Sequence, residues 1–300
     1  MEKLVWKSPT IEGLKHYRVL PFRGSDTSWV NIFLLRRKYD LEIAEYNGTL
    51  LRFYHGKGPN RQGYGFPLSA GETDYERIFG LLKQDAQDRG GIRFCLCDES
   101  QREIVSKYFD IEWQTDIGDN DYIYEGGKWI DFRGKKYEHL RNRMNRFNRS
   151  YDDVTYHPID DERRLQDAMH VSQIWQEEHV NNEMPHEDLE EEQKSINEVA
   201  ERWQELDMKG GVLYVGGSPV AMTMASYLSS DSVDFHFDKA VGQFAAAGAT
   251  VVSRRHFALA DIAGGRPYFN LEEDMNIPGL RQSKGTYRPM QRLAKYYGGA

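Results

Sequence analysis

The chain has 300 residues, of which 13% are aromatic, and a formal net charge of −8 at pH 7. This length is enough for one large domain or two of ordinary size with a buried core. The negative charge excludes a protein that is cationic over its whole surface, although it is compatible with a local basic face.

Targeting signals and cysteine usage predict a cytoplasmic protein. The first ten residues, MEKLVWKSPT, contain no apolar signal-peptide core, and no run approaches the roughly 18 apolar residues that a membrane span requires. Cys95 and Cys97 would face the same side of a strand, where a disulfide would be strained. We therefore expect two reduced core cysteines and no membrane span.

The first half of the chain predicts a hairpin, a strand, a helix and a further strand. Asn47-Gly48 separates two strand-like runs and favours a tight type I′ turn. Apolar residues from Tyr75 to Leu82 recur at helical spacing. The expected elements are strands at 41–46, 49–55, 63–68 and 92–97 and a helix over 73–88.

Residues 132–151 predict a helix with two different faces. Its apolar stripe consists of Tyr137, Leu140, Met144 and Phe147. Its cationic face consists of Lys135, Arg143, Arg146 and Arg149. We expect the apolar stripe to bridge the two halves of the chain. The cationic face is either a solvated surface or a contact for the phosphates of a nucleic acid or of an anionic donor, and the excess of Arg favours bidentate phosphate binding.

The second half repeats the order of the first. The expected elements are helices near 160–180 and 188–207, strands at 210–215, 220–228 and 233–237, a helix over 246–263 that stops at Gly264-Gly265, and a strand over 267–272. This repeated order indicates a structural duplication, although the halves share no apparent sequence identity. His179 and His186 lie in an acidic helical stretch without a recognised ligand spacing, so we predict no metal site.

The order of elements in the second half resembles the GNAT superfamily of N-acyltransferases. The segment KAVGQFAAAGAT is similar to the superfamily's Q/R-x-x-G-x-G/A loop, with Ala246 where the first Gly belongs. In that superfamily the loop cradles a cofactor pyrophosphate on backbone N–H groups. The resemblance implies a donor-binding set of Gln243, Ala246, Gly248, Ala249 and Thr250, with Arg254 further along the helix.

A second resemblance covers nearly the whole chain. The segments DYIYEGGKWIDFRGKKYEHLRNRMNRF and FNLEEDMNIPGLRQSKGTYRP look like the phosphatidylglycerol lysyltransferase C-terminal domain family, including its soluble members of unknown function. SWVNIFLLRRKYD and GPNRQGYGFPL fit the same family. The resemblance implies a tandem GNAT-like fold related to the Fem peptidyltransferases, whose membrane members move an aminoacyl group from aminoacyl-tRNA to a lipid. This chain lacks their transmembrane segments.

The two resemblances suggest where acyl transfer would occur. The strand VDFHF is similar to the one that supplies an acidic active-site residue in the lysyltransferases, and that residue maps to Asp234. His236 shares its strand face by the period-two rule. The further candidates are Glu272, Asp274, Lys284 and Tyr287, the acids as bases and the last two as oxyanion donors. Asp234 is the preferred base and Glu272 the second choice. The alternatives are that Asp234 and His236 are only a buried hydrogen-bonded pair, and that residues 269–289 are only a surface loop with ordinary ion pairs.

We therefore expect an α+β protein with a tandem GNAT-like fold, in which a basic helix joins two mixed-sheet halves. The expected parts are a mainly structural half at 1–125, a linker helix at 126–158 and a half with the active site at 159–300. The predicted activity is transfer of an acyl or aminoacyl group from acyl-CoA or aminoacyl-tRNA to an amine or hydroxyl acceptor. The alternatives are a non-catalytic module that binds RNA or a small ligand, and a regulatory protein that recognises an amine. The residues do not identify the acyl group, the acceptor or the oligomeric state.

Overall fold

The computed structural model describes residues 3–179, 186–263 and 265–300. Its first part contains strands β1 (Glu42–Tyr46), β2 (Thr49–His55), β3 (Gln62–Tyr64), β4 (Arg93–Cys97) and β5 (Glu112–Thr115), and helices α1 (Ile11–Leu14), α2 (Trp29–Leu34), α3 (Tyr75–Asp85) and α4 (Glu99–Val105). Together with β13 (Tyr296–Gly299), these strands form a six-stranded sheet in the order β1-β2-β3-β4-β13-β5.

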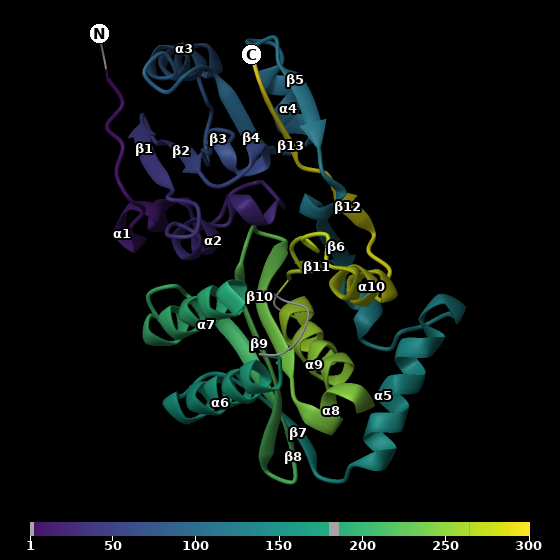
Figure 1. The fold of residues 1–300 in the computed structure, drawn as a ribbon. Coiled ribbons are helices and arrows are strands. Elements are labelled where there is room, and N and C mark those ends of the chain that lie inside the picture. The colour runs from purple at the N-terminus through teal and green to yellow at the C-terminus, as the bar shows by residue number, and fades with distance from the viewer. Residues whose placement is uncertain (1–2, 180–185, 264) are drawn as a thin grey trace.

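The second sheet lies below the first in Figure 1. Its strands are β6 (Asp121–Glu125), β7 (Val154–Pro158), β8 (Lys209–Val215), β9 (Ser218–Tyr227), β10 (Ser232–Ala240), β11 (Tyr268–Asn270) and β12 (Gln291–Leu293), in the order β12-β6-β11-β10-β9-β8-β7. The accompanying helices are α5 (Glu138–Ser150), α6 (Glu162–His179), α7 (His186–Glu201), α8 (Gly242–Ala247), α9 (Ala249–Ala263) and α10 (Pro278–Thr286). The predicted α+β class with two mixed sheets is confirmed.

Local sequence signals account for the elements at the centre of each half. Asn47 and Gly48 have φ of 47° and 73°, and Gly216 and Gly217 have φ of 56° and 78°, as tight hairpin turns require. Helix α3 begins after Asp74, whose side chain accepts a hydrogen bond from the backbone N–H group at position 77. The predicted hairpins are confirmed, and Cys95 and Cys97 are both buried and unpaired.

Each sheet contains one pair of parallel strands in the corresponding place. In the first sheet β3 runs parallel to β4, and in the second β10 runs parallel to β11. The pairing of β10 with β11 covers only 232–234 with 268–270, whereas β10 continues to Ala240. The two strands therefore separate after Asp234, and the side chains that follow on β10 face a gap beside the first half.

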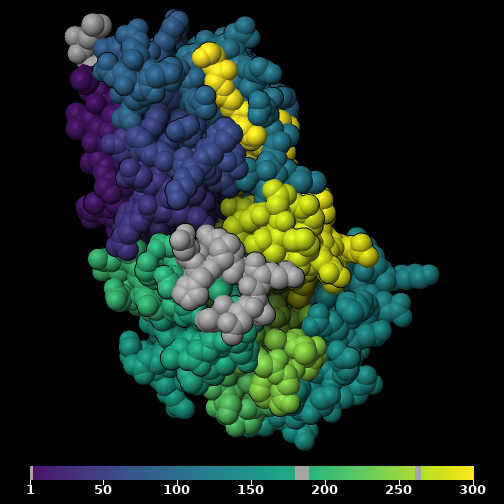
Figure 2. Space-filling view, viewed as in Figure 1, coloured from purple at the N-terminus to yellow at the C-terminus, as the bar shows by residue number. Residues whose placement is uncertain are grey.

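The two halves exchange strands. Strand β6 pairs with β11 and β12 in the second sheet, and the C-terminal strand β13 pairs with β4 and β5 in the first. Figure 2 shows the C-terminal segment (yellow) running from the lower half onto the upper one. The domain boundaries at 125 and 158 stay a prediction, but hydrogen bonding between strands crosses the first of them.

The apolar stripe of the basic helix is buried as expected, but on the second half alone. Tyr137, Leu140 and Phe147 are buried, and α5 packs mainly against α8 and α9. Among the described residues its main contacts are therefore with helices of the second sheet and do not form the bridge that the sequence predicted. The reason is that its apolar partners, the cluster around Trp129 and the start of α9, pack on the second sheet.

The helix predicted over 246–263 is two helices. Gly248 has φ of 119° and separates α8 from α9. A Cβ atom at this position would lie 3.3 Å from the carbonyl oxygen of Arg143, so the glycine allows α5 to approach closely. The stop predicted at Gly264-Gly265 falls partly on residue 264, outside the described residues. Within the described ranges, none of the helices combines the length and apolar character that crossing a bilayer would require, and the cytoplasmic location stays a prediction.

Replacement of Leu140 by Ala is expected to lower the free energy of unfolding by roughly 2–5 kcal/mol, because the side chain is 1% exposed and its removal leaves a cavity. Leu259→Ala on α9, where the side chain is 38% exposed, is the matched control and should change little. Urea unfolding of both variants measures the difference. Equal, small effects would show that α5 contributes little to the core.

Candidate functional site

A cavity of about 180 Å³ lies between the two halves, beside the gap where β10 and β11 separate. Apolar side chains from the first half, including Ile32 and Leu41, line one side. His236, Glu272 and Glu273 from the second half line the other. The cavity therefore combines an apolar wall with ionisable groups, as small-molecule sites commonly do.

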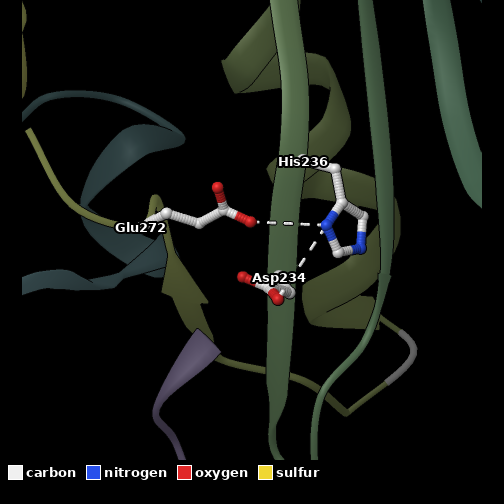
Figure 3. Close-up of side chains that lie close together, drawn as sticks. All are labelled: Asp234, His236 and Glu272. Carbon is white, nitrogen blue, oxygen red and sulfur yellow. Dashed lines mark ion pairs between the residues drawn. The ribbon is translucent and has the colours of Figure 1, made fainter. Parts of the chain in front are cut away.

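His236 and Asp234 reach this region from β10, and a β-bulge lies at His236. The register with β9 shifts between Phe235 and Phe237, which re-aims the intervening side chain. The His236 ring is 2% exposed and Asp234 is fully buried. Figure 3 shows both side chains on the same strand, with Glu272 pointing toward them from the neighbouring segment.

Asn31 on α2 links these three residues across the interface between the halves. Its amide nitrogen lies 3.0 Å from Asp234 Oδ2 and 2.9 Å from Glu272 Oε1, and donates to both. Its amide oxygen accepts from His236 Nδ1 at 3.0 Å. The other ring nitrogen, Nε2, shares a hydrogen bond of 2.7 Å with the hydroxyl group of Ser226. The imidazole is thus held at both nitrogens.

Glu272 is held in place through its own backbone. It has φ of 56°, a value that is rare for residues other than Gly, and its N–H group donates to Asn270 Oδ1. Lys284 Nζ donates to the carbonyl oxygens of Leu271 and Glu273, one on each side of it. The side chain of Glu272 remains 26% exposed, so it is the accessible member of the group.

A second cluster surrounds the buried ammonium group of Lys295. Its Nζ lies 2.7 Å from Asp121 Oδ1, 3.4 Å from Asp26 Oδ1 and 4.0 Å from Glu273 Oε2. Arg61 pairs with Glu273 from the opposite side at 3.4 Å. These residues come from both halves, so the cluster joins them at the cavity.

The surroundings of Asp234 and Glu273 shift the pKa values of these two carboxyl groups in opposite directions. Desolvation and the neighbouring carboxylates of Glu272 and Asp121 raise the pKa of Asp234 well above its usual range. Burial also tends to raise the pKa of Glu273, but Lys295 and Arg61 outweigh that effect and lower it to about 2. Asp234 therefore favours its protonated form, and Glu273 favours its charged form.

The cluster of Asp234, His236 and Glu272 offers three potential metal ligand atoms within 4.8 Å of one another among the residues described. The Asn31 amide already lies between them and donates to both carboxylates. The absence of a metal stays a prediction, and the side chain of His186 lies outside what the structure describes.

The other predicted catalytic residues do not line the cavity. Asp274 is buried and forms a bidentate pair with Arg281, and it also accepts from the hydroxyl group of Tyr122. Lys284 contacts backbone carbonyl groups, as described above. Tyr287 is buried in the aromatic cluster of the second half. Each of these side chains therefore supports the wall of the cavity or the core behind it.

The predicted donor loop does not line the cavity, and two of its backbone N–H groups have partners within the protein. The N–H group of Gly248 donates to the carbonyl oxygens of residues 244 and 245 within α8, and that of Gly242 donates to Glu178. Arg254 is buried and pairs with Asp238. The remaining predicted members, Gln243, Ala246, Ala249 and Thr250, lie on α8 and the first turn of α9.

The predicted basic contacts lie on a different face from the cavity. Lys135, Arg146 and Arg149 are exposed, whereas Arg143 is half-buried and donates to the carbonyl oxygen of Ala245. Their role as anion contacts stays a prediction.

Sequence reasoning missed the members of the site that come from distant segments. Asn31, Arg61, Asp121 and Lys295 were not among the candidate residues. The acids next to Glu272 offered a weak signal for Glu273. The others had none, because the pairing of residues from opposite ends of the chain is a property of the assembled halves.

Comparison with known proteins agrees with the fold. The family model described as "Phosphatidylglycerol lysyltransferase, C-terminal" matches residues 17–298. A conserved protein of unknown function from Bacteroides thetaiotaomicron is 24% identical, with a TM-score of 0.87, over 99% of each chain. L-PGS from Bacillus licheniformis is 15% identical with a TM-score of 0.67, covering 98% of this chain and 93% of that one.

A further solved structure, FemX, is 8% identical with a TM-score of 0.61 and covers 99% of this chain and 97% of that one. No curated protein matches significantly. These likenesses show the fold, and the predicted tandem GNAT-like architecture is confirmed.

The free energy of unfolding of Asp234→Asn, relative to that of wild type, is expected to increase as the pH rises above about 4. The folded protein raises the pKa of Asp234, so its contribution to stability is fully present below the unfolded pKa and is lost as the pH rises through the folded pKa. Asn does not titrate. Urea unfolding across this range measures the change, with Asp88→Asn on the surface as the control. A stability difference between Asp234→Asn and wild type that stays constant with pH would contradict the raised pKa.

Proposed function

Because the chain belongs to the family of the phosphatidylglycerol lysyltransferase C-terminal domain, we propose that it transfers an acyl or aminoacyl group from an activated donor to an amine or hydroxyl acceptor. The observation that carries this proposal is the accessible carboxylate of Glu272 on the wall of the inter-half cavity, 3.4 Å from His236 Nδ1. An amine nucleophile must lose a proton during acyl transfer, and a carboxylate beside the acceptor is suited to take it.

In this proposal Glu272 is the base, in place of the Asp234 preferred from the sequence. Asp234 is fully buried and favours its protonated form, so it is poorly suited to accept a proton from a substrate in the cavity. Asp234 and His236 instead orient Asn31, whose amide donates to Glu272. They act as positioning residues for the base.

The transfer step balances without a further reactant. The acceptor nitrogen or oxygen bonds to the carbonyl carbon of the donor, and the bond from that carbon to the donor oxygen or sulfur breaks. The proton that the acceptor loses passes through Glu272 to the leaving group. Lys295 and Arg61 also line the cavity, and their positive charges favour the oxyanion that develops on the carbonyl oxygen.

Two observations support aminoacyl-tRNA over acyl-CoA as the donor. The backbone N–H groups of Gly242 and Gly248, in the loop expected to cradle a pyrophosphate, donate to acceptors within the protein. The matched family is also described as a lysyltransferase, which transfers an aminoacyl group. The acceptor remains an amine or a hydroxyl group of unspecified identity.

Aminoacylated tRNA is expected to raise the melting temperature of the protein, because a ligand that binds the native state stabilises it by mass action. Acetyl-CoA and a longer acyl-CoA are expected to leave the melting temperature unchanged. Uncharged tRNA is the control that separates recognition of the aminoacyl group from binding of RNA. A melting temperature raised by acyl-CoA alone would assign the donor to CoA.

Once a donor and acceptor are identified, Glu272→Gln is expected to lower kcat by about 10²-fold or more, because the amide cannot take the proton. Glu191→Gln is the matched control, since Glu191 also lines the cavity but pairs with Lys194. Steady-state kinetics at saturating donor measures the effect. Near wild-type turnover of Glu272→Gln would exclude Glu272 as the base, and donor binding without turnover in the wild type would favour a binding module.

A further inference from the structure

A second hollow, away from the inter-half cavity, has an unusual charge for this chain. Its volume is about 460 Å³, and its charged lining residues are the cations Lys128, Lys136, Arg288 and Arg292 and the single acid Glu125. The whole chain carries a net charge of −8, so this excess of cations is local. All four basic side chains are exposed, and we name the space that they line the cationic hollow.

The cationic hollow continues into a neighbouring depression. Lys136, Arg288 and Arg292 line both spaces, and His139 on α5 extends the second. No acid contributes to the lining of that second space among the residues described. Two stretches far apart in the sequence supply these groups: residues 128–139, which lead into α5, and residues 288–292, which join α10 to β12. The cations therefore line two adjoining spaces.

One residue of the lining carries a buried hydrogen-bond donor without an acceptor in the described structure. Trp129 lines the hollow and is fully buried, and its Nε1–H group has no partner among the described residues. An unsatisfied buried donor is costly. Arg254 lies 4.3 Å from the centre of the Tyr287 ring, and its Nη1 also lacks a partner in the described structure.

The backbone at Arg288 supports the same interpretation. This residue has φ of 55°, in the left-handed region where Gly or Asn is more usual. Its strained conformation directs an exposed guanidinium group to the rim shared by the two spaces. Backbone strain of this kind is often retained where a side chain has a binding role.

We propose that the cationic hollow binds phosphate groups arranged in series, as in a polynucleotide backbone or an inorganic polyphosphate. Arg and Lys side chains bind phosphate oxygens through charge-assisted hydrogen bonds. The site is independent of the proposed transfer reaction, because none of its residues lines the inter-half cavity.

The test compares two double variants that change the charge equally. Arg288→Glu with Arg292→Glu alters the hollow, and Lys83→Glu with Lys107→Glu alters two exposed lysines of the first half. The probes are a short labelled single-stranded RNA, followed by fluorescence anisotropy at several salt concentrations, and inorganic pyrophosphate, followed by thermal shift. Circular dichroism checks the fold, and Lys136→Glu is a milder third variant at an exposed position.

The double variant Arg288→Glu with Arg292→Glu is expected to bind the RNA at least about tenfold more weakly than wild type. The slope of log Kd against the logarithm of the salt concentration should fall by about 1.4, because two phosphate contacts are lost. Lys136→Glu should weaken binding in the same direction, and the control pair should not. Binding of pyrophosphate but not RNA would identify a small phosphorylated ligand, and the reverse would identify a polynucleotide. The proposal is overturned if wild type binds neither probe, or if the control pair weakens binding as much as Arg288→Glu with Arg292→Glu.

Discussion

The junction of the two halves depends on the ion pairs of the buried Lys295 ammonium group. It lies within 2.7 Å of Asp121 from the second sheet and 3.4 Å of Asp26 from the first half. Removing these charges from water is costly, so each stays buried only while its partners are in place. The chain meets this requirement because β13, directly after Lys295, is hydrogen-bonded into the first sheet while β12 belongs to the second. The residues between these two strands therefore carry the cation to the interface.

The geometry of the candidate site follows from this junction. Asn31 reaches Asp234, His236 and Glu272 only when α2 is held beside the first half of β10. Glu273 pairs with Lys295 and Arg61, and the adjacent Glu272 consequently turns toward the cavity with a positive φ. Lys284, a candidate oxyanion donor in the sequence, fixes the same turn through two carbonyl oxygens. A reactive group at this point is thus supported from both halves, which favours one defined orientation.

Local patterns in the sequence predicted much of the fold and part of the site. Asn47-Gly48 and Gly216-Gly217 marked the hairpins, because tight turns need residues that tolerate positive φ. The period of two along β10 placed Asp234 and His236 together, although the bulge between 235 and 237 was not foreseen. Asn31 could not be found this way, since its partner Asp234 lies more than 200 residues away in the sequence. Lys295 could not be found either, since its partners come from both halves. Gly248 was taken for part of a phosphate cradle, but the approach of α5 gives its conformation another cause.

The central claim is that substrate binds in the cavity between the halves, next to Glu272. Hydrogen–deuterium exchange with and without a non-hydrolysable aminoacyl-adenosine, in which an amide replaces the ester, tests this claim most directly. We expect the ligand to slow exchange in α2 and the following segment to Leu41, and in the loop from Glu272 to Met275, because these segments line the cavity. Slower exchange confined to residues 242–250, or no change anywhere in the chain, would contradict the account.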